Sequence, residues 1–173
     1  MTMHSLTCSI LLCFALALSG SSGQMNKTCI QPMLAAADAL ERLIDCPEGW
    51  YLHNGACYAF VNLPMSWNNA ELFCEKKGGH LASIHSDVEN NFVRQLTRNP
   101  ATGSYPHAYI GGHKLPINTW AWTDGTLMDY TDWAADRPDN WGGNENCIHI
   151  VSVAADWNDI YCAAEFAFVC KAK

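Results

Sequence analysis

The chain has 173 residues, of which 49% are hydrophobic and 16% charged, a composition that indicates one packed domain with an appendage and excludes a disordered chain. Ten lysines and arginines against seventeen aspartates and glutamates give a net charge of −7. With no basic run, this balance argues against a nucleic-acid-binding protein.

Residues 1–22 are predicted to form a secretory signal peptide. An apolar run over residues 10–18 is followed by small residues at 19–23, like the apolar core and cleavage region of such peptides. This run is too short to cross a bilayer, which takes about 20 apolar residues, and no later run reaches that length. We therefore expect a secreted, extracellular protein without a membrane span.

Residues 23–45 are predicted to form a leader with a short helix. Pro32 suits a helix start, and apolar residues then recur at helical spacing at Met33, Leu34, Ala37, Leu40 and Ile44. Either this helix packs on the following domain or it pairs with a second copy of the chain. Asn26 opens a glycosylation sequon, Asn26-Lys27-Thr28, near the expected mature N-terminus.

The nine cysteines divide into three groups. Cys8 and Cys13 leave with the signal peptide, Cys29 lies in the leader, and six fall between residues 46 and 170. Spacing alone does not say how those six pair. In an oxidising compartment the odd Cys29 favours a disulfide-linked homodimer, although a capped or free thiol stays open. Close Cys-x-x-Cys pairs, which would indicate a zinc cluster, are missing.

Residues 46–100 predict a hairpin and two helices. Strand-like runs flank the turn dipeptide Asn54-Gly55. The first helix is expected from Ser66 to Gly78-Gly79, with one face made of Trp67, Ala70, Phe73, Cys74 and Lys77. The second starts at a capping box formed by Ser86 and Glu89 and stops at Asn99-Pro100. Its expected buried stripe is Val88, Phe92, Val93 and Leu96.

Residues 101–146 are rich in turn formers and aromatic side chains, which predicts a long irregular region of functional importance. Two alternating strands then follow, around residues 147–151 and 167–170. The sequence thus predicts an α+β domain over residues 46–173, with two helices, short antiparallel sheets and a long loop region.

An ordered series of landmarks resembles a C-type lectin-like domain, in particular the galactose-binding and type II antifreeze group of fish proteins. The landmarks run from Cys-Pro-x-Gly-Trp at 46–50 through His-Leu-Ala-Ser-Ile at 80–84 and Tyr-Ile-Gly-Gly at 109–112 to Trp-x-Trp-x-Asp-Gly at 120–125, Glu-Asn-Cys at 145–147, Trp-Asn-Asp at 157–159 and Phe-Val-Cys at 168–170. The resemblance implies the disulfides Cys46–Cys57, Cys74–Cys170 and Cys147–Cys162.

The same resemblance implies a calcium site. Its ligands would be Asp139, Glu145, Asn158 and Asp159, whose side chains all offer the oxygen donors that calcium prefers. One position departs from the family pattern, because Arg137 stands where a ligand is usual, and a guanidinium has only donors. Two outcomes are open. Calcium binds with one ligand fewer and lower affinity, or Arg137 neutralises the carboxylates and replaces the ion.

The resemblance also points to the sugar. In the family, aspartate at the position of Asp139 accompanies galactose, and an aromatic ring at the position of Trp141 lies against the apolar face of the sugar. The sugar-binding set is therefore expected to be Arg137, Asp139, Trp141, Glu145 and Asn158. Trp120, Trp122 and Trp157 are expected to pack within the loop region, whereas Trp141, next to Gly142, should be more exposed.

The sequence predicts a carbohydrate-binding lectin for galactose-containing glycans, with two alternatives. Type II antifreeze-like ice binding is one, although residues 140–144 lack the threonines of the calcium-dependent members. A calcium-independent, protein-binding domain of the same fold is the other, and Arg137 supports it. An enzyme is not expected, because the sequence has neither a His-Glu-x-x-His nor a Gly-x-Ser-x-Gly motif.

Overall fold

The computed structural model describes residues 46–151 and 156–173. The predicted signal peptide 1–22, the leader 23–45 with its helix, the sequon at Asn26 and the odd Cys29 all lie outside the described residues. Within the described part of the chain, no helix is long and apolar enough to cross a membrane.

The predicted hairpin is confirmed. Strands β1 (Tyr51–His53) and β2 (Ala56–Met65) pair antiparallel, with His53 opposite Ala56. The two residues between them, Asn54 and Gly55, both have positive φ, at 47° and 78°. Such angles match the twist of the flanking strands, which is why Asn-Gly is favoured there.

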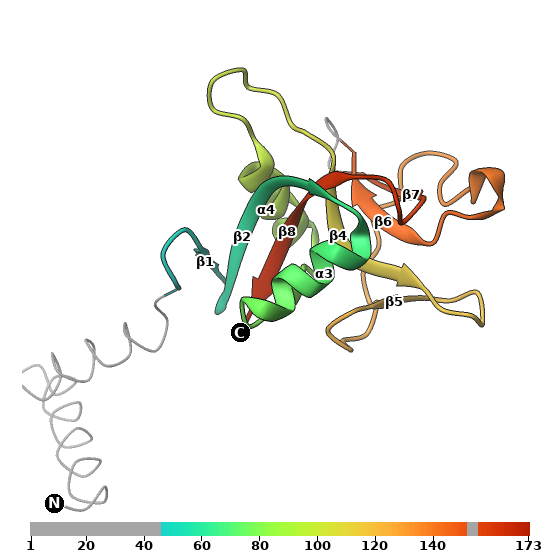
Figure 1. Ribbon diagram of the computed structural model, residues 1–173, viewed down its shortest axis with the longest axis horizontal. Coiled ribbons are helices and arrows are strands. Elements are labelled where there is room, and N and C mark those ends of the chain that lie inside the picture. The colour runs from blue at the N-terminus through green and yellow to red at the C-terminus, as the bar shows by residue number, and fades with distance from the viewer. Residues whose placement is uncertain (1–45, 152–155) are drawn as a thin grey trace, which may run out of the picture. The chain divides into compact units, whose positions relative to one another are not determined.

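The strands form one connected sheet with the order β1-β2-β8-β4-β6-β7 (Figure 1). Its further members are β8 (Phe166–Ala172), β4 (Ala108–Lys114), β6 (Cys147–Ile150) and β7 (Trp157–Ile160). Two short strands join from the side: β3 (His80–Leu81) pairs with β8, and β5 (Trp120–Trp122) pairs with β4. All pairs are antiparallel except β4 with β8. The α+β class is thereby confirmed.

Strand β4 lies inside the stretch where the sequence predicts turns. Its two glycines, Gly111 and Gly112, are strand residues rather than turn residues, and both are buried. A Cβ on Gly112 would lie 2.3 Å from Ile148 Cδ1, and a Cβ on Gly111 would lie 2.5 Å from the Leu81 carbonyl oxygen. The glycines therefore permit close packing of strand β4 against its neighbours, a use that composition does not distinguish from a turn.

Helix α3 (Trp67–Lys76) packs against β3 and β8, and helix α4 (Asp87–Thr97) contacts β2. The predicted inner face of α3 is confirmed for Trp67, Ala70 and Cys74, which are buried. Ser86 caps α4 as predicted, because its hydroxyl accepts from the Glu89 N–H. The Glu89 carboxylate, however, accepts from the His85 N–H rather than from that of Ser86.

The predicted apolar stripe of α4 is partly wrong. Val93 is buried, but Val88 is 65% exposed, and the buried positions next to it are the polar Glu89 and Asn90. Asn90 accepts from Trp157 Nε1 at 3.0 Å and donates to Asp132 at 2.6 Å. Distant partners thus make it favourable to bury a polar face, and hydropathy along the helix does not reveal those partners.

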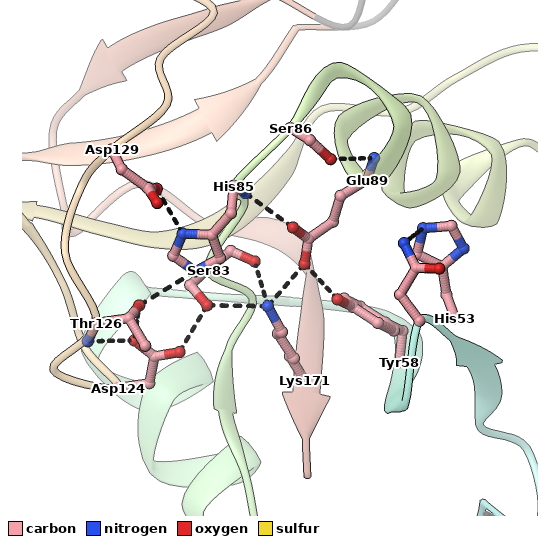
Figure 2. A network of polar contacts seen from close by, with 11 residues as sticks. His53, Tyr58, Ser83, His85, Ser86, Glu89, Asp124, Thr126, Asp129 and Lys171 are labelled. Atoms are coloured by element: carbon pink, nitrogen blue, oxygen red, sulfur yellow. Dashed lines mark hydrogen bonds and ion pairs between the residues drawn. The ribbon is translucent and has the colours of Figure 1, made fainter.

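Figure 2 shows the polar network that holds α4 against the end of β8. Lys171 Nζ lies 2.6 Å from Glu89 Oε1 and also donates to the carbonyl and hydroxyl oxygens of Ser83. Tyr58 donates to the same Glu89 oxygen, and Asp124 accepts from Ser83. Burial alone raises the pKa of Glu89, but hydrogen bonds from Lys171 and Tyr58 outweigh it and leave the pKa below its usual value.

Three disulfides join cysteines of the described part, and they are the pairs that the resemblance implied. Cys46–Cys57 closes the first hairpin, Cys74–Cys170 ties α3 to β8, and Cys147–Cys162 joins the start of β6 to the segment after β7. The last of these brings the loop before β6 close to β7. That loop lies at the end of the sheet away from β1 (Figure 1).

Candidate functional site

Three of the four predicted calcium ligands meet beside strand β7. Asp139 and Glu145 come from the loop that leads into β6, and Asp159 comes from β7 itself. One carboxylate oxygen from each lies within 4.8 Å of the others. Glu145 and Asp159 are buried, with 6% and 0% of their surface exposed, whereas Asp139 is exposed. We call these three residues the carboxylate cluster.

The carboxylate cluster organises its own loop through backbone hydrogen bonds. Asp159 accepts from the N–H groups of Asp139 at 3.1 Å and Asn140 at 2.8 Å, which holds the loop against β7. Asn140 has a φ of 48°, and its side chain accepts from the Glu145 N–H at 3.0 Å. Glu145 in turn accepts from the Trp141 N–H at 2.9 Å. The loop conformation therefore depends on the carboxylates of Asp159 and Glu145.

The cluster has an excess of negative charge. Burial raises the pKa of Glu145, the N–H of Trp141 opposes this, and the nearby Asp159 and Asp139 raise the pKa further. The cation that contacts the cluster among the described residues is Arg137, whose Nη1 lies 2.5 Å from Asp139 Oδ1. One guanidinium facing three carboxylates leaves about two negative charges uncompensated. That remainder suits a divalent cation.

Asn158, the fourth predicted ligand, makes its hydrogen bond to a residue outside the carboxylate cluster. Its Nδ2 donates to His149 Nε2 at 3.1 Å. Its Oδ1 is buried and has no hydrogen-bond partner within the described part of the chain. A buried acceptor without a donor is costly unless a cation or water meets it. The three carboxylates therefore suit calcium, which prefers oxygen ligands, while Arg137 competes for Asp139.

No pattern in the sequence connects two histidines, His149 and His107, with Asn158. His149 is 97% buried, since only 3% of its surface is exposed, and its Nδ1 lies 3.3 Å from His107 Nδ1. Burial, together with the neighbouring charges of His107 and Arg137, lowers the pKa of His149 to about 3. His149 therefore stays neutral and can accept from Asn158. Its place opposite Asn158 in the β6–β7 pairing is a register relation that no local motif reveals.

The tryptophans separate as expected. Trp157 and Trp122 are 0% and 2% exposed and belong to the main hydrophobic core, with Trp120 partly buried against it. Trp141 is 78% exposed. It is therefore the tryptophan among these four that can offer a ring to a ligand, directly beside the carboxylate cluster.

Known proteins of similar sequence bind different ligands. The chain is 38% identical over 165 residues to the type-2 ice-structuring protein of Osmerus mordax. The aligned region covers 94% of this chain and 89% of the relative. The chain is also 35% identical over 126 residues to the galactose-specific lectin nattectin of Thalassophryne nattereri, covering 72% of this chain and 79% of the relative. None of these names describes an enzyme.

A solved structure gives the same fold. The crystal structure of a calcium-independent type II antifreeze protein matches with a TM-score of 0.66 and 33% identity, covering 73% of this chain and 93% of that one. The Lectin C-type domain family matches residues 63–172. The chain therefore belongs to the C-type lectin domain family, whose members bind ligands and are not enzymes.

Proposed function

We propose that this protein is a secreted lectin that binds galactose-type glycans beside Trp141, with calcium assisting. The observation that carries the proposal is the exposed indole of Trp141, on a residue whose backbone N–H donates to Glu145 in the carboxylate cluster. A sugar ring has one apolar face and many hydroxyls, so an exposed aromatic ring next to hydrogen-bonding groups is a suitable complement. Nattectin, a relative of 35% identity, is named as galactose-specific.

Asp139, Glu145 and Asp159 would hold the calcium ion, and Asn158 would add a neutral oxygen. When bound, calcium would supply coordination positions for two sugar hydroxyls. The protein's own part is to bring the acids together, to keep Glu145 and Asp159 away from water and to hold the backbone of Trp141 at Glu145. Arg137 weakens this site, because its guanidinium already pairs with Asp139 at 2.5 Å.

Calorimetry on the full mature chain tests this proposal. Calcium is titrated first into chelator-treated protein, and galactose and mannose follow with and without chelator. We expect a calcium-binding heat and a preference for galactose that chelator weakens. No calcium heat, together with sugar binding unchanged by chelator, would remove calcium from the proposal. No binding of either sugar would refute the lectin function itself.

Ice binding is the second candidate. The ice-structuring relative of Osmerus mordax covers 94% of this chain, more than nattectin does. The Arg137–Asp139 ion pair would also stabilise the loop in the absence of a metal ion. Thermal hysteresis and ice-crystal shaping at millimolar protein test this candidate, and their absence alongside galactose binding would decide for the lectin. If the protein shows neither ice binding nor galactose binding but captures a protein partner in a pull-down, a protein-binding domain would be favoured.

Secretion and dimer formation complete the proposal. They rest on the signal peptide predicted at residues 1–22, and on the leader at 23–45 with Cys29. Single lectin sites bind sugars weakly, so a disulfide-linked pair would gain affinity by binding two sugars at once. Non-reducing electrophoresis of secreted protein should show a dimer that reduction converts to a monomer. Glycosidase treatment in the same experiment should shift the band if Asn26 is glycosylated.

A further inference from the structure

A second group of metal-ligating side chains lies on α3 and β3, on elements that take no part in the carboxylate cluster. Glu71 and Glu75 are four residues apart on α3 and so share one face of the helix. His80 begins β3. One ligand atom from each of the three lies within 4.8 Å of the others.

The turn between α3 and β3 brings His80 back beside the helix. Gly78 has a φ of 88°, which ends the helix in a left-handed turn. A Cβ on Gly79 would lie 2.2 Å from the Lys171 carbonyl oxygen, so a glycine is needed where the chain passes under β8. His80 then pairs with Lys171 in the sheet. The Cys74–Cys170 disulfide fixes the same helix to the same strand.

Glu71 is already oriented as a ligand would be. Its Oε2 accepts from the Leu81 N–H at 2.9 Å, which leaves Oε1 to face His80 Nδ1 at 2.6 Å. The side chain of Glu71 is 13% exposed and that of His80 is 41% exposed. A second hydrogen bond of this kind fixes the direction of a ligating carboxylate in metal sites. Glu75, on the next helical turn, is exposed.

We propose that Glu71, Glu75 and His80 bind a zinc ion. One imidazole and two carboxylates are ligands that zinc accepts, and three protein ligands with a water complete its tetrahedron. The imidazole favours zinc over calcium, which prefers oxygen ligands throughout. The two carboxylates balance the charge of the ion. A bound zinc would join α3 to β3 and so stabilise the folded state.

The test uses the full mature chain, stripped of metal, with zinc chloride titrated by calorimetry and cobalt as a spectroscopic probe. Glu75→Gln and His80→Gln are the test variants, because Glu71 also bonds to the backbone and its loss could disturb folding. Glu48→Gln is the matched carboxylate control, since Glu48 is exposed in the first turn of the domain. His107→Ala controls for zinc binding at the close pair of histidines, His107 and His149.

We expect one zinc per chain, with affinity reduced at least about tenfold in both test variants, the loss that even an outer partner of a metal ligand causes. The cobalt absorption of the wild type should disappear with them, and both controls should keep it. Zinc should also raise the Tm of the wild type more than that of Glu75→Gln. Equal zinc affinity in wild type and both variants, or loss of binding with His107→Ala instead, would overturn the proposal.

Discussion

The backbone N–H of Trp141 lies 2.9 Å from Glu145 Oε2, so the residue that carries the exposed indole is hydrogen-bonded to a glutamate that is 6% exposed. The aromatic surface and the acids are therefore parts of one unit. A substitution of Glu145 should therefore displace Trp141, whereas a substitution of the Trp141 side chain should leave the acids in place. This asymmetry allows sugar contact and cation contact to be tested separately.

Trp141→Ala should weaken galactose binding at least about tenfold, which corresponds to about 1.4 kcal/mol, because the sugar loses its apolar surface. Stability should change by no more than about 0.5 kcal/mol, since the side chain is exposed. Calcium affinity should stay the same. Leu127→Ala is the matched control, because Leu127 is 81% exposed and lies outside the cluster. Equal losses of galactose binding in both variants would contradict the role of Trp141.

Arg137→Gln should raise calcium affinity at least about tenfold, since it removes a positive charge from Asp139 and supplies an acceptor oxygen. The folded state should lose no more than about 1 kcal/mol, as is usual for partly exposed ion pairs. Calcium calorimetry measures the first effect and thermal unfolding the second. Arg98→Gln makes the same charge change at the end of α4 and should leave calcium affinity unaltered. A lower affinity in Arg137→Gln would show that Arg137 is not what weakens the site.

Glu89→Gln should destabilise the domain by about 3 kcal/mol at neutral pH, because the Lys171 ammonium, on a side chain only 13% exposed, loses its carboxylate partner. The pKa of Glu89 is lowered in the folded state, so its contribution is fully present above the ordinary value of about 4.5 and is lost as pH falls below it. Urea unfolding from pH 7 to pH 3 should therefore show a smaller acid-dependent loss in the variant than in the wild type. Glu165→Gln, at an exposed position, should follow the wild-type curve.

Asn90→Leu should cost about 1–3 kcal/mol, because Trp157 Nε1 is buried and loses its acceptor at 3.0 Å. The near-ultraviolet signal of the buried tryptophan should change at the same time. Asn91→Leu, one position along α4 on the exposed side, should have little effect on either measurement. If the two variants behave alike, the Asn90–Trp157 bond does not stabilise the core.

The sequence predicts those parts of the fold that depend on near neighbours. Asn54-Gly55 specifies its hairpin and Ser86 its helix cap, because each acts within four residues. It fails for Val88 and Glu89, since the burial of Glu89 depends on Lys171, 82 residues away. The same holds at the site. The family pattern brings together Asp139, Glu145 and Asp159, but the contact between Asn158 and His149 depends on the register of β6 with β7.

Strand β8 lies between β2 and β4 in the sheet, although it is the last strand of the chain. During synthesis, β2 and β4 cannot be joined into one sheet until residues 166–172 are made, because β8 is the strand that pairs with both. Cys74 likewise has no partner until Cys170 enters the oxidising compartment. The central strand of the sheet can therefore form only once residues 166–172 have been synthesised. Removal of residues 166–172, or a bulky group fused close to them, would disrupt a central strand of the sheet rather than an edge strand.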